Sequence, residues 1–220
     1  MRKWATAGLF TSVLLLCGCG QLVRATSDFA FNEPWKDYQR VEIRVQNGNV
    51  ELRATDVTDV RVSGRKSVGG LTFAEAEENL NKIVVKAAAS SDHPDTLRVD
   101  VSFPDELRQK SVGTDLVVQI PQPCAAQVHS SNGKVQVEHL AGPTELDLRS
   151  SNGAIHATLP ESFAAEYRLA ATNGHVSVSL GQATVKSLES SKRRYHAVVN
   201  GGGATVIAET SNGSVTVDTR

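Results

Sequence analysis

A five-residue phrase built around Asn-Gly occurs five times along the chain. In each copy a polar residue precedes Asn-Gly, and Val or Ile stands two positions after the glycine. The copies are Asn47-Gly48, Asn132-Gly133, Asn152-Gly153, Asn173-Gly174 and Asn212-Gly213. The three middle copies are 20 and then 21 residues apart, a spacing that is typical of stacked repeat units. The chain is therefore predicted to be built from one repeated structural unit.

The residues around each Asn-Gly alternate between apolar and polar. Val135 and Val137 stand three and five positions after Asn132, and Val128 and Ala126 stand four and six positions before it. A period of two residues indicates β-strands with one buried face, so each copy is predicted to form strand, corner and strand. Asn and Gly suit the corner because both tolerate a positive φ. If Gly153 has such a φ, Gly153→Val is expected to destabilise the domain by about 1–3 kcal/mol.

Two architectures satisfy this pattern. Asn-Gly between alternating strands is a strong hairpin signal and would give an antiparallel β-sandwich, in which residues 126–131 pair with residues 134–139. Alternatively, each copy is one coil of a parallel β-solenoid whose equivalent residues stack in ladders. The near-constant period and the small residue before most of the asparagines favour the second architecture. The predicted fold class is therefore an all-β, parallel β-solenoid-like repeat domain.

The solenoid makes a prediction about the side chains of successive coils. One buried ladder, with steps of about 4.8 Å, would contain Val135, Ile155 and Val176. Their polar neighbours would stack outside as a continuous stripe of Gln136, His156 and Ser177. This stripe is the candidate binding face that the repeat predicts.

The first residues have the features of a secretion signal. Arg2 and Lys3 give a positive start, and residues 9–16 form an apolar core that is too short to cross a bilayer. The segment ends in Leu16-Cys17-Gly18-Cys19, which resembles the lipobox of bacterial lipoproteins. The resemblance implies that residues 1–18 are a signal peptide and that Cys19 carries fatty acyl chains such as palmitate. Residues 19–39 would then be a lipidated tether, followed by a domain over residues 40–220.

The lipid anchor would place the protein in the cell envelope. An Asp after the acylated cysteine commonly retains such proteins at the inner membrane of Gram-negative bacteria, and this chain has Gly20 there. The outer membrane is therefore favoured over the inner one, with the periplasmic or surface side left open. The expected partners are the membrane, through the lipid, and an envelope protein or a glycan.

Composition argues against several other classes of function. The formal net charge is −1 at pH 7 and charges of both signs are interspersed, so no attraction to nucleic acid is expected. Cys17 would leave with the signal and Cys19 would be acylated, so Cys124 has no partner for an intrachain disulfide. The six histidines do not share one repeat position. Neither a metal site nor a cofactor is expected.

Between the first two copies of the repeat the pattern is less regular. Residues 73–82 predict one short helix, with Thr72 and Glu75 as a capping box at its start. With the opening strand at Asn47-Gly48, the run Ile120-Pro121-Gln122-Pro123 and the serial Ser-Asn-Gly corners, residues 40–220 resemble the bacterial putative-adhesin domain. This is an envelope-exported β-repeat family of unknown function. The resemblance implies a right-handed β-solenoid or a related rolled sheet, and it supplies no catalytic residues.

The function expected from these features is that of a non-catalytic binding or scaffolding module on the envelope. One alternative is a glycan-cleaving or glycan-binding solenoid, for which four residues would have to converge across adjacent coils: Glu138, Glu145, Asp147 and Arg149. A second alternative is an envelope-stress sensor or accessory protein that acts through protein contacts. An enzyme is not expected, since a fold does not by itself confer an activity.

Overall fold

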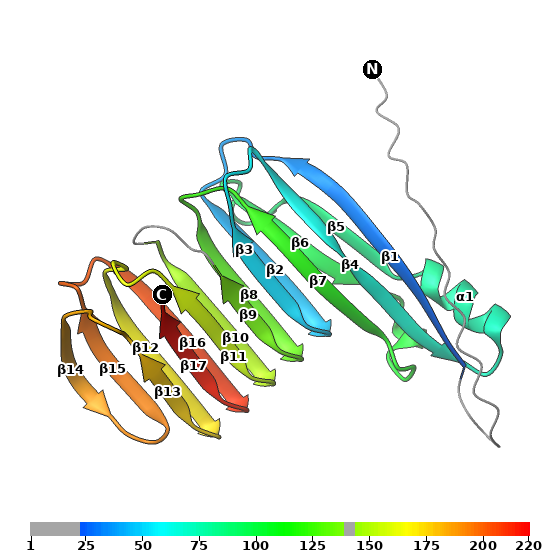
Figure 1. The fold of residues 1–220 in the computed structure, drawn as a ribbon. Coiled ribbons are helices and arrows are strands. Elements are labelled where there is room, and N and C mark those ends of the chain that lie inside the picture. Colours follow the sequence, from blue (N-terminus) through cyan, green and yellow to red (C-terminus); the bar gives the residue numbers. More distant parts are fainter. Residues whose placement is uncertain (1–22, 139–143) are drawn as a thin grey trace.

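A computed structural model describes residues 23–138 and 144–220 (Figure 1). The predicted signal peptide and Cys19 lie outside the described residues. Two large β-sheets are stacked as two layers, and the single α-helix of the described residues, α1 (Phe73–Asn81), lies at one end of the stack. Strands β14 and β15 lie at the other end.

Each sheet has its own strand order. We call the eight-stranded sheet A; its order is β1 (Val23–Pro34), β4 (Asp59–Gly70), β7 (Gly113–Ile120), β3 (Val50–Ala54), β9 (Val135–Glu138), β11 (Ile155–Leu159), β17 (Val215–Thr219) and β13 (Val176–Ser179). We call the nine-stranded sheet B; its order is β14 (Val185–Ser190), β15 (Arg194–Val199), β12 (Ala165–Asn173), β16 (Ala204–Asn212), β10 (Leu146–Asn152), β8 (Ala125–Asn132), β2 (Arg40–Asn47), β6 (Thr96–Ser102) and β5 (Val84–Ala89).

Every Asn-Gly copy is a corner where the chain passes from sheet B to sheet A. The five resulting coils are β2–β3, β8–β9, β10–β11, β12–β13 and β16–β17, and their neighbouring strands pair in parallel. Val135 pairs with Ile155 across β9 and β11, and Asn132 pairs with Asn152 across β8 and β10. The solenoid-like fold is therefore confirmed and the Asn-Gly hairpin alternative is wrong. Antiparallel pairs occur only toward the ends of the described sheets, as in β1–β4–β7, β5–β6 and β12–β15–β14.

The coils do not stack in chain order. The last coil, β16–β17, lies between β10–β11 and β12–β13, so Val215 stands between Ile155 and Val176. The predicted ladder is therefore correct from Val135 to Ile155 and wrong in its last step. The reason is that β15 pairs antiparallel with the outer edge of β12, which leaves only the inner edge of β12 for β16.

The core follows from the period-two pattern. The inward side chains of both sheets are buried, with Ile43, Val128 and Leu148 fully so. A second, smaller core lies under α1, where Ala76 and Leu80 pack with Val68 and Ile83. The helix begins as predicted, because the Thr72 hydroxyl accepts a hydrogen bond of 3.1 Å from the Glu75 backbone N–H.

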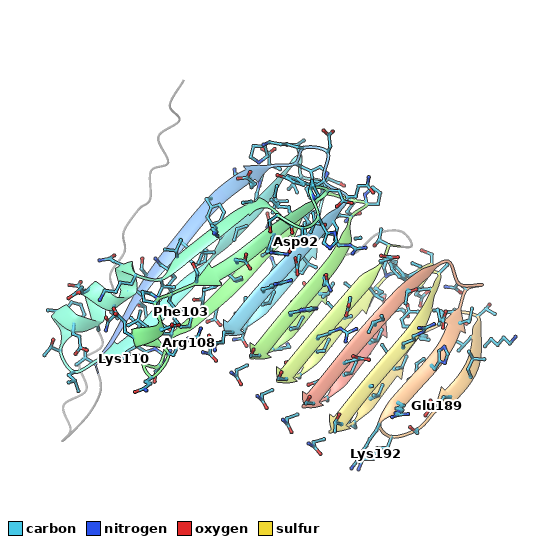
Figure 2. The ribbon with its side chains drawn as sticks, turned by 180° about the vertical axis from the view of Figure 1, so that it is seen from behind. Asp92, Phe103, Arg108, Lys110, Glu189 and Lys192 are labelled. Atoms are coloured by element: carbon cyan, nitrogen blue, oxygen red, sulfur yellow. The ribbon has the colours of Figure 1, made fainter. Side chains whose placement is uncertain are left out.

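The folded domain begins earlier than the sequence predicts. β1 pairs along its whole length with β4, from Val23 against Gly70 to Pro34 against Asp59. Residues 23–34, expected to belong to a tether, therefore form a strand of sheet A. Figure 2 shows the molecule from behind, with Arg108 and Lys110 near the α1 end and Lys192 at the opposite end. Lys110 connects its loop to the helix through an ion pair of 2.6 Å with Glu75.

The corner asparagines form a continuous hydrogen-bonded ladder. In the spatial order Asn47, Asn132, Asn152, Asn212 and Asn173, the side-chain amide of each asparagine after the first donates to the side-chain oxygen of the preceding one at 2.7–2.9 Å. None of these asparagines has a positive φ; among the described non-glycine residues only Asn200 does. The expectation that Asn occupies the corner for its φ is therefore wrong, and the ladder is the physical reason for its presence.

The corner glycines are required by close stacking. A Cβ on Gly153 would lie 1.9 Å from the carbonyl oxygen of Gly133, and one on Gly174 would lie 1.7 Å from that of Gly213. Gly48, Gly133 and Gly213 also have a positive φ of 137–155°, whereas Gly153 does not. The basis expected for the effect of Gly153→Val was therefore wrong, because the constraint at Gly153 is contact between adjacent coils.

Candidate functional site

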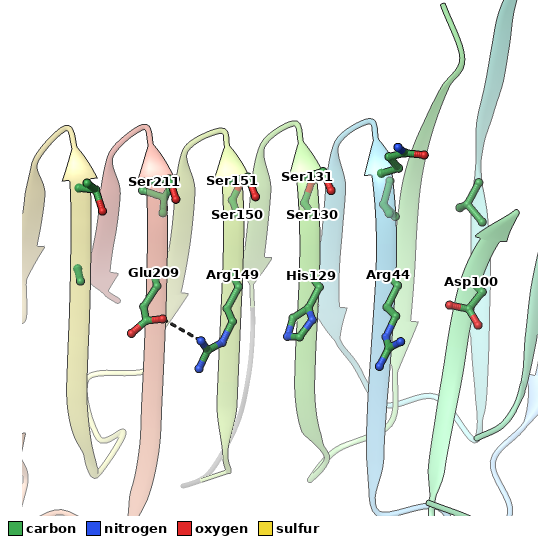
Figure 3. A pocket seen from close by; sticks show the side chains of 16 residues that line it. Arg44, Asp100, His129, Ser130, Ser131, Arg149, Ser150, Ser151, Glu209 and Ser211 are labelled. Carbon is green, nitrogen blue, oxygen red and sulfur yellow. Dashed lines mark hydrogen bonds and ion pairs between the residues drawn. The ribbon is translucent and has the colours of Figure 1, made fainter. Parts of the chain in front are cut away.

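A trough of about 900 Å³ crosses the outer face of sheet B beside the corners (Figure 3). It runs over six neighbouring strands, β6, β2, β8, β10, β16 and β12. Its long direction is therefore perpendicular to the strands and parallel to the axis along which the coils stack. Because neighbouring strands are about 4.8 Å apart, the side chains along it repeat at that interval.

One side of the trough is a row of mostly charged side chains, which we call the charged row; it also includes one histidine. In spatial order this charged row is Asp100, Arg44, His129, Arg149 and Glu209, with Ala170 at its end. The last five are the residues three positions before each corner Asn. Their strands bring them into register, so one column of the repeat becomes one wall of the site.

The other side is a row of small polar side chains next to the corners. We call it the hydroxyl row; it contains Ser131, Ser151, Ser211 and Thr172, with Gln46 at its end. All five are exposed and stand immediately before the corner asparagines. Between the two rows the side chains of Ser130, Ser150 and Thr210 are buried. The Thr210 hydroxyl donates to the carbonyl oxygen of Gly153 at 2.9 Å.

The cations of the charged row are held by carboxylates. Arg149 donates to Asp147 on its own strand and to Glu209 on the next strand, both at 2.9 Å. The hydrogen bond that Arg149 donates to Asp147 is the main reason that the pKa of Arg149 lies above its usual value. Arg44 donates to Glu42 at 2.6 Å. Both arginine side chains are about half exposed and so remain open to a ligand.

The buried carboxylate of Glu42 holds two arginine side chains in place. Its side chain is only 6% exposed and also accepts from Arg98 at 2.8 Å. Burial alone would raise the pKa of this carboxyl, but the hydrogen bonds from Arg98 and Arg44 outweigh it and the pKa lies below its usual value. Glu42 is thus an anion at neutral pH that fixes two arginines on neighbouring strands.

The stripe predicted from the repeat lies on the other sheet. Gln136, His156 and Ser177 are outward residues of β9, β11 and β13, and Thr216 of β17 stands between the last two. Side chains of the stripe are engaged along their own strands, as where the Gln136 oxygen accepts from Lys134 at 2.7 Å. The stripe is therefore real with one inserted member, but it lies on the opposite face from the trough.

The four residues of the enzyme alternative do not converge. Glu138 belongs to β9 in sheet A, whereas Asp147 and Arg149 belong to β10 in sheet B. Glu145 is paired with Arg40 at 2.7 Å. The convergence that a glycan-cleaving site would require of these four residues is therefore not found.

Neither the free cysteine nor the possible metal ligands of the chain form a reactive site among the described residues. Cys124 is buried and burial raises the pKa of its thiol to about 12. Within residues 23–138 and 144–220, no three His, Cys, Asp or Glu side chains gather as metal ligands would. In the same part of the chain, no helix is long and apolar enough to span a bilayer.

The trough does not follow from the alternation of residues along single strands, because neighbouring positions in it belong to different strands. The signal that could have revealed it is the column three positions before Asn, which contains charged or ionisable residues in four of five copies. The position immediately before Asn, which is serine in three of the five copies, forms the opposite side of the trough. The spatial neighbours along the trough depend on the inserted last coil, which the columns do not reveal.

The fold and its repeated corners define a β-solenoid-like repeat domain, as the sequence resemblance predicted. The chain belongs to the Toastrack DUF4097 family, whose model matches residues 35–218. No curated protein matches it.

Two solved structures are similar to this chain. One is a putative cell adhesion protein from Clostridium sporogenes, with a TM-score of 0.52 at 10% identity, covering 89% of this chain and 100% of that one. The other is a putative adhesin from Parabacteroides merdae, with a TM-score of 0.37 at 11% identity, covering 91% and 82%. At 10% identity the first likeness is one of fold alone. The second has too low a TM-score to support a conclusion about this chain.

Proposed function

We propose that this protein is a lipid-anchored, non-catalytic module of the bacterial envelope that holds an extended partner along the trough of sheet B. The observation that carries the proposal is the trough itself, which continues over six strands with polar side chains on both sides. An elongated site of this kind suits a partner that makes many weak contacts. It lacks a grouped set of reactive residues among its described lining.

The rigidity of the coils supports a binding role. The asparagine ladder and the parallel strand pairs hold the charged row and the hydroxyl row at a fixed spacing. Preorganised side chains lose little conformational entropy on binding, and so weak contacts add up to useful affinity. The same rigidity makes the solenoid a suitable scaffold.

The anchor gives the module an orientation. Val23, where β1 begins, is four positions after Cys19. Strand pairing puts Phe29 of β1 level with Gly64, Leu116 and Val50, the first strand residue after a corner. The six residues from Phe29 back to Val23 extend about 20 Å past the corners. In this proposal the corners and the trough therefore face the membrane that holds the lipid.

The anchoring part of the proposal is tested by Cys19→Ala. The variant is expected to leave the membrane fraction after a high-salt wash, because acylation supplies the hydrophobic attachment. Wild-type protein, which should stay with the membranes, is the control. Retention of the variant would contradict lipid anchoring at this residue.

The binding part is tested by photocrosslinking in intact cells. A photoreactive residue at Ser151 lies in the trough, and one at Ser177, exposed on sheet A, is the matched control. A discrete adduct is expected from Ser151 and not from Ser177. If neither position gives an adduct, or both give the same one, the trough is not the binding site.

A further inference from the structure

The direction of the trough restricts the shape of its ligand. Equivalent side chains recur at each strand step of about 4.8 Å, which is comparable to the length of one sugar residue in an extended glycan. A polypeptide lying in this direction would find the strands already paired on both sides, so β-strand addition is not available to it. The repeat of the site thus favours a polymer whose recognition does not need a free strand edge.

The lining restricts the chemistry of the ligand. Among the described residues that line the trough, only Val45, Val101 and Ala170 are apolar, and none is Phe, Tyr or Trp. The hydroxyl row offers donors and acceptors in succession, as a polyhydroxylated ligand requires. Apolar side chains of a peptide, or a lipid tail, would find little to bury against.

Although Glu42 and Asp147 pair with its two arginines, the charged row has its basic side chains at the centre of the trough. Arg44, His129 and Arg149 occupy three adjacent strands, and Figure 3 shows all three side chains pointing away from the corners in the same direction. Guanidinium groups match carboxylate and phosphate geometry. The carboxylates of the row, Asp100 and Glu209, stand at its two ends, four strand steps or about 19 Å apart. A ligand anion would therefore sit between them, at His129.

We propose that the trough binds an acidic polysaccharide, lying along the solenoid axis with an anionic group at His129 between Arg44 and Arg149. The inference rests on the proposed function and adds the class of ligand. Carboxylates of acidic sugars and phosphates on sugars provide the same chemistry. The hydroxyl row binds the neutral parts of the chain on either side of the anion.

The test uses the mature protein in detergent and three soluble probes: polygalacturonate oligomers, phosphomannan and dextran. Calorimetry at low salt should give binding of at least one acidic probe, and dextran should bind at least tenfold more weakly. Affinity for the acidic probe should fall as salt rises. The acidic probe that binds identifies the anion as carboxylate or phosphate. Equal affinity for dextran would overturn the role assigned to the charged row.

Two variants of one ion pair should shift affinity in opposite directions. Arg149→Gln removes a cation and should weaken acidic binding by about fivefold, the change expected for one exposed charge contact. Glu209→Gln removes the carboxylate that neutralises Arg149 and should strengthen binding. A purely structural role for the pair would change affinity in the same direction in both variants, and that result would overturn the inference.

A steric pair of variants completes the design. Ser151→Tyr fills the trough and should abolish binding of the acidic probe, whereas Ser177→Tyr on the opposite sheet should leave it unchanged. If Ser151 crosslinks to a cellular protein while no acidic probe binds, the polysaccharide assignment fails and the proposed function stands. If Ser151 crosslinks to nothing in cells, the proposed function itself fails.

Discussion

The substitution Gly153→Ala tests whether close stacking is what requires glycine at the corners. The new Cβ would lie 1.9 Å from the carbonyl oxygen and 2.6 Å from the carbonyl carbon of Gly133, where ordinary contacts begin at 3.4 Å. Backbone atoms cannot rotate away as a side chain does, so the two coils must separate locally. The separation strains two backbone hydrogen bonds of 2.9 Å, from Gly133 to the Asn152 carbonyl and from Val135 to the Ala154 carbonyl.

The expected cost follows from those contacts. Losing two hydrogen bonds costs about 1–3 kcal/mol, and the weakened Asn152–Asn132 amide contact raises the total to roughly 2–4 kcal/mol. With a urea m value of about 2–3 kcal/mol/M, the unfolding midpoint should fall by about 1 M. Circular dichroism at increasing urea concentration measures this midpoint directly.

Gly69→Ala is the matched control. Its Cβ would have its nearest contact at 3.8 Å, with Ser111, and its φ lies outside the left-handed range. The loss of unfolded-state freedom should then leave stability unchanged or raise it by about 0.4–1 kcal/mol. If Gly153→Ala and Gly69→Ala unfold at the same urea concentration, stacking does not explain the corner glycines and the reasoning is refuted.

Three further predictions concern the ladder and the buried groups. Asn212 both donates to and accepts from neighbouring asparagines, whereas Asn173 only donates within the ladder. Asn212→Ala should therefore lower the free energy of unfolding in urea by about 1–2 kcal/mol, and Asn173→Ala by about half as much. Equal losses in the two variants would contradict the ladder. The pKa of Glu42 lies below 4.5 because its hydrogen bonds, led by that from Arg98, outweigh burial. Since the pKa of Glu42 is depressed in the folded state, its stabilisation of the fold is present above pH 4.5 and is lost as the pH falls through the folded pKa. Urea titrations from pH 6 to 3 should therefore show a smaller loss of stability with acid for Glu42→Gln than for the wild type. Burial raises the pKa of Cys124 to about 12, so a thiol reagent at pH 8 should label it only after denaturation, and rapid labelling of the folded protein would show that the thiol is accessible.

Much of the fold could be predicted because the repeat acts locally. Val135 and Val137 each follow an Asn-Gly at a fixed offset, so burial, strand and corner could all be inferred from a few residues. β1 could not be found in this way. Its sequence contains Ser27, Asp28 and Asn32, which have low strand propensity, and it is an edge strand held by its pairing with β4.

The candidate site was less predictable for a different reason. A trough perpendicular to the strands is built from one residue of each coil, and so neighbours in the site are distant in the chain. Arg149 and Glu209 are in contact at 2.9 Å, yet 60 positions separate them. Side-chain columns of the repeat predict which residue types share a row, but only strand order tells which of them touch.

The order of the coils therefore sets the charge pattern of the trough. In a stack that followed the chain, Arg149 would have Ala170 as its neighbour, and its cation would lack the carboxylate of Glu209. The strand that prevents this is β15, which pairs with the outer edge of β12 from Ala165 against Val199 onward. With that edge occupied, β16 pairs between β10 and β12 and brings Glu209 beside Arg149. The segment that departs most from the repeat, the pair β14–β15, thus determines where the anionic end of the charged row lies and leaves Arg44, His129 and Arg149 at its centre.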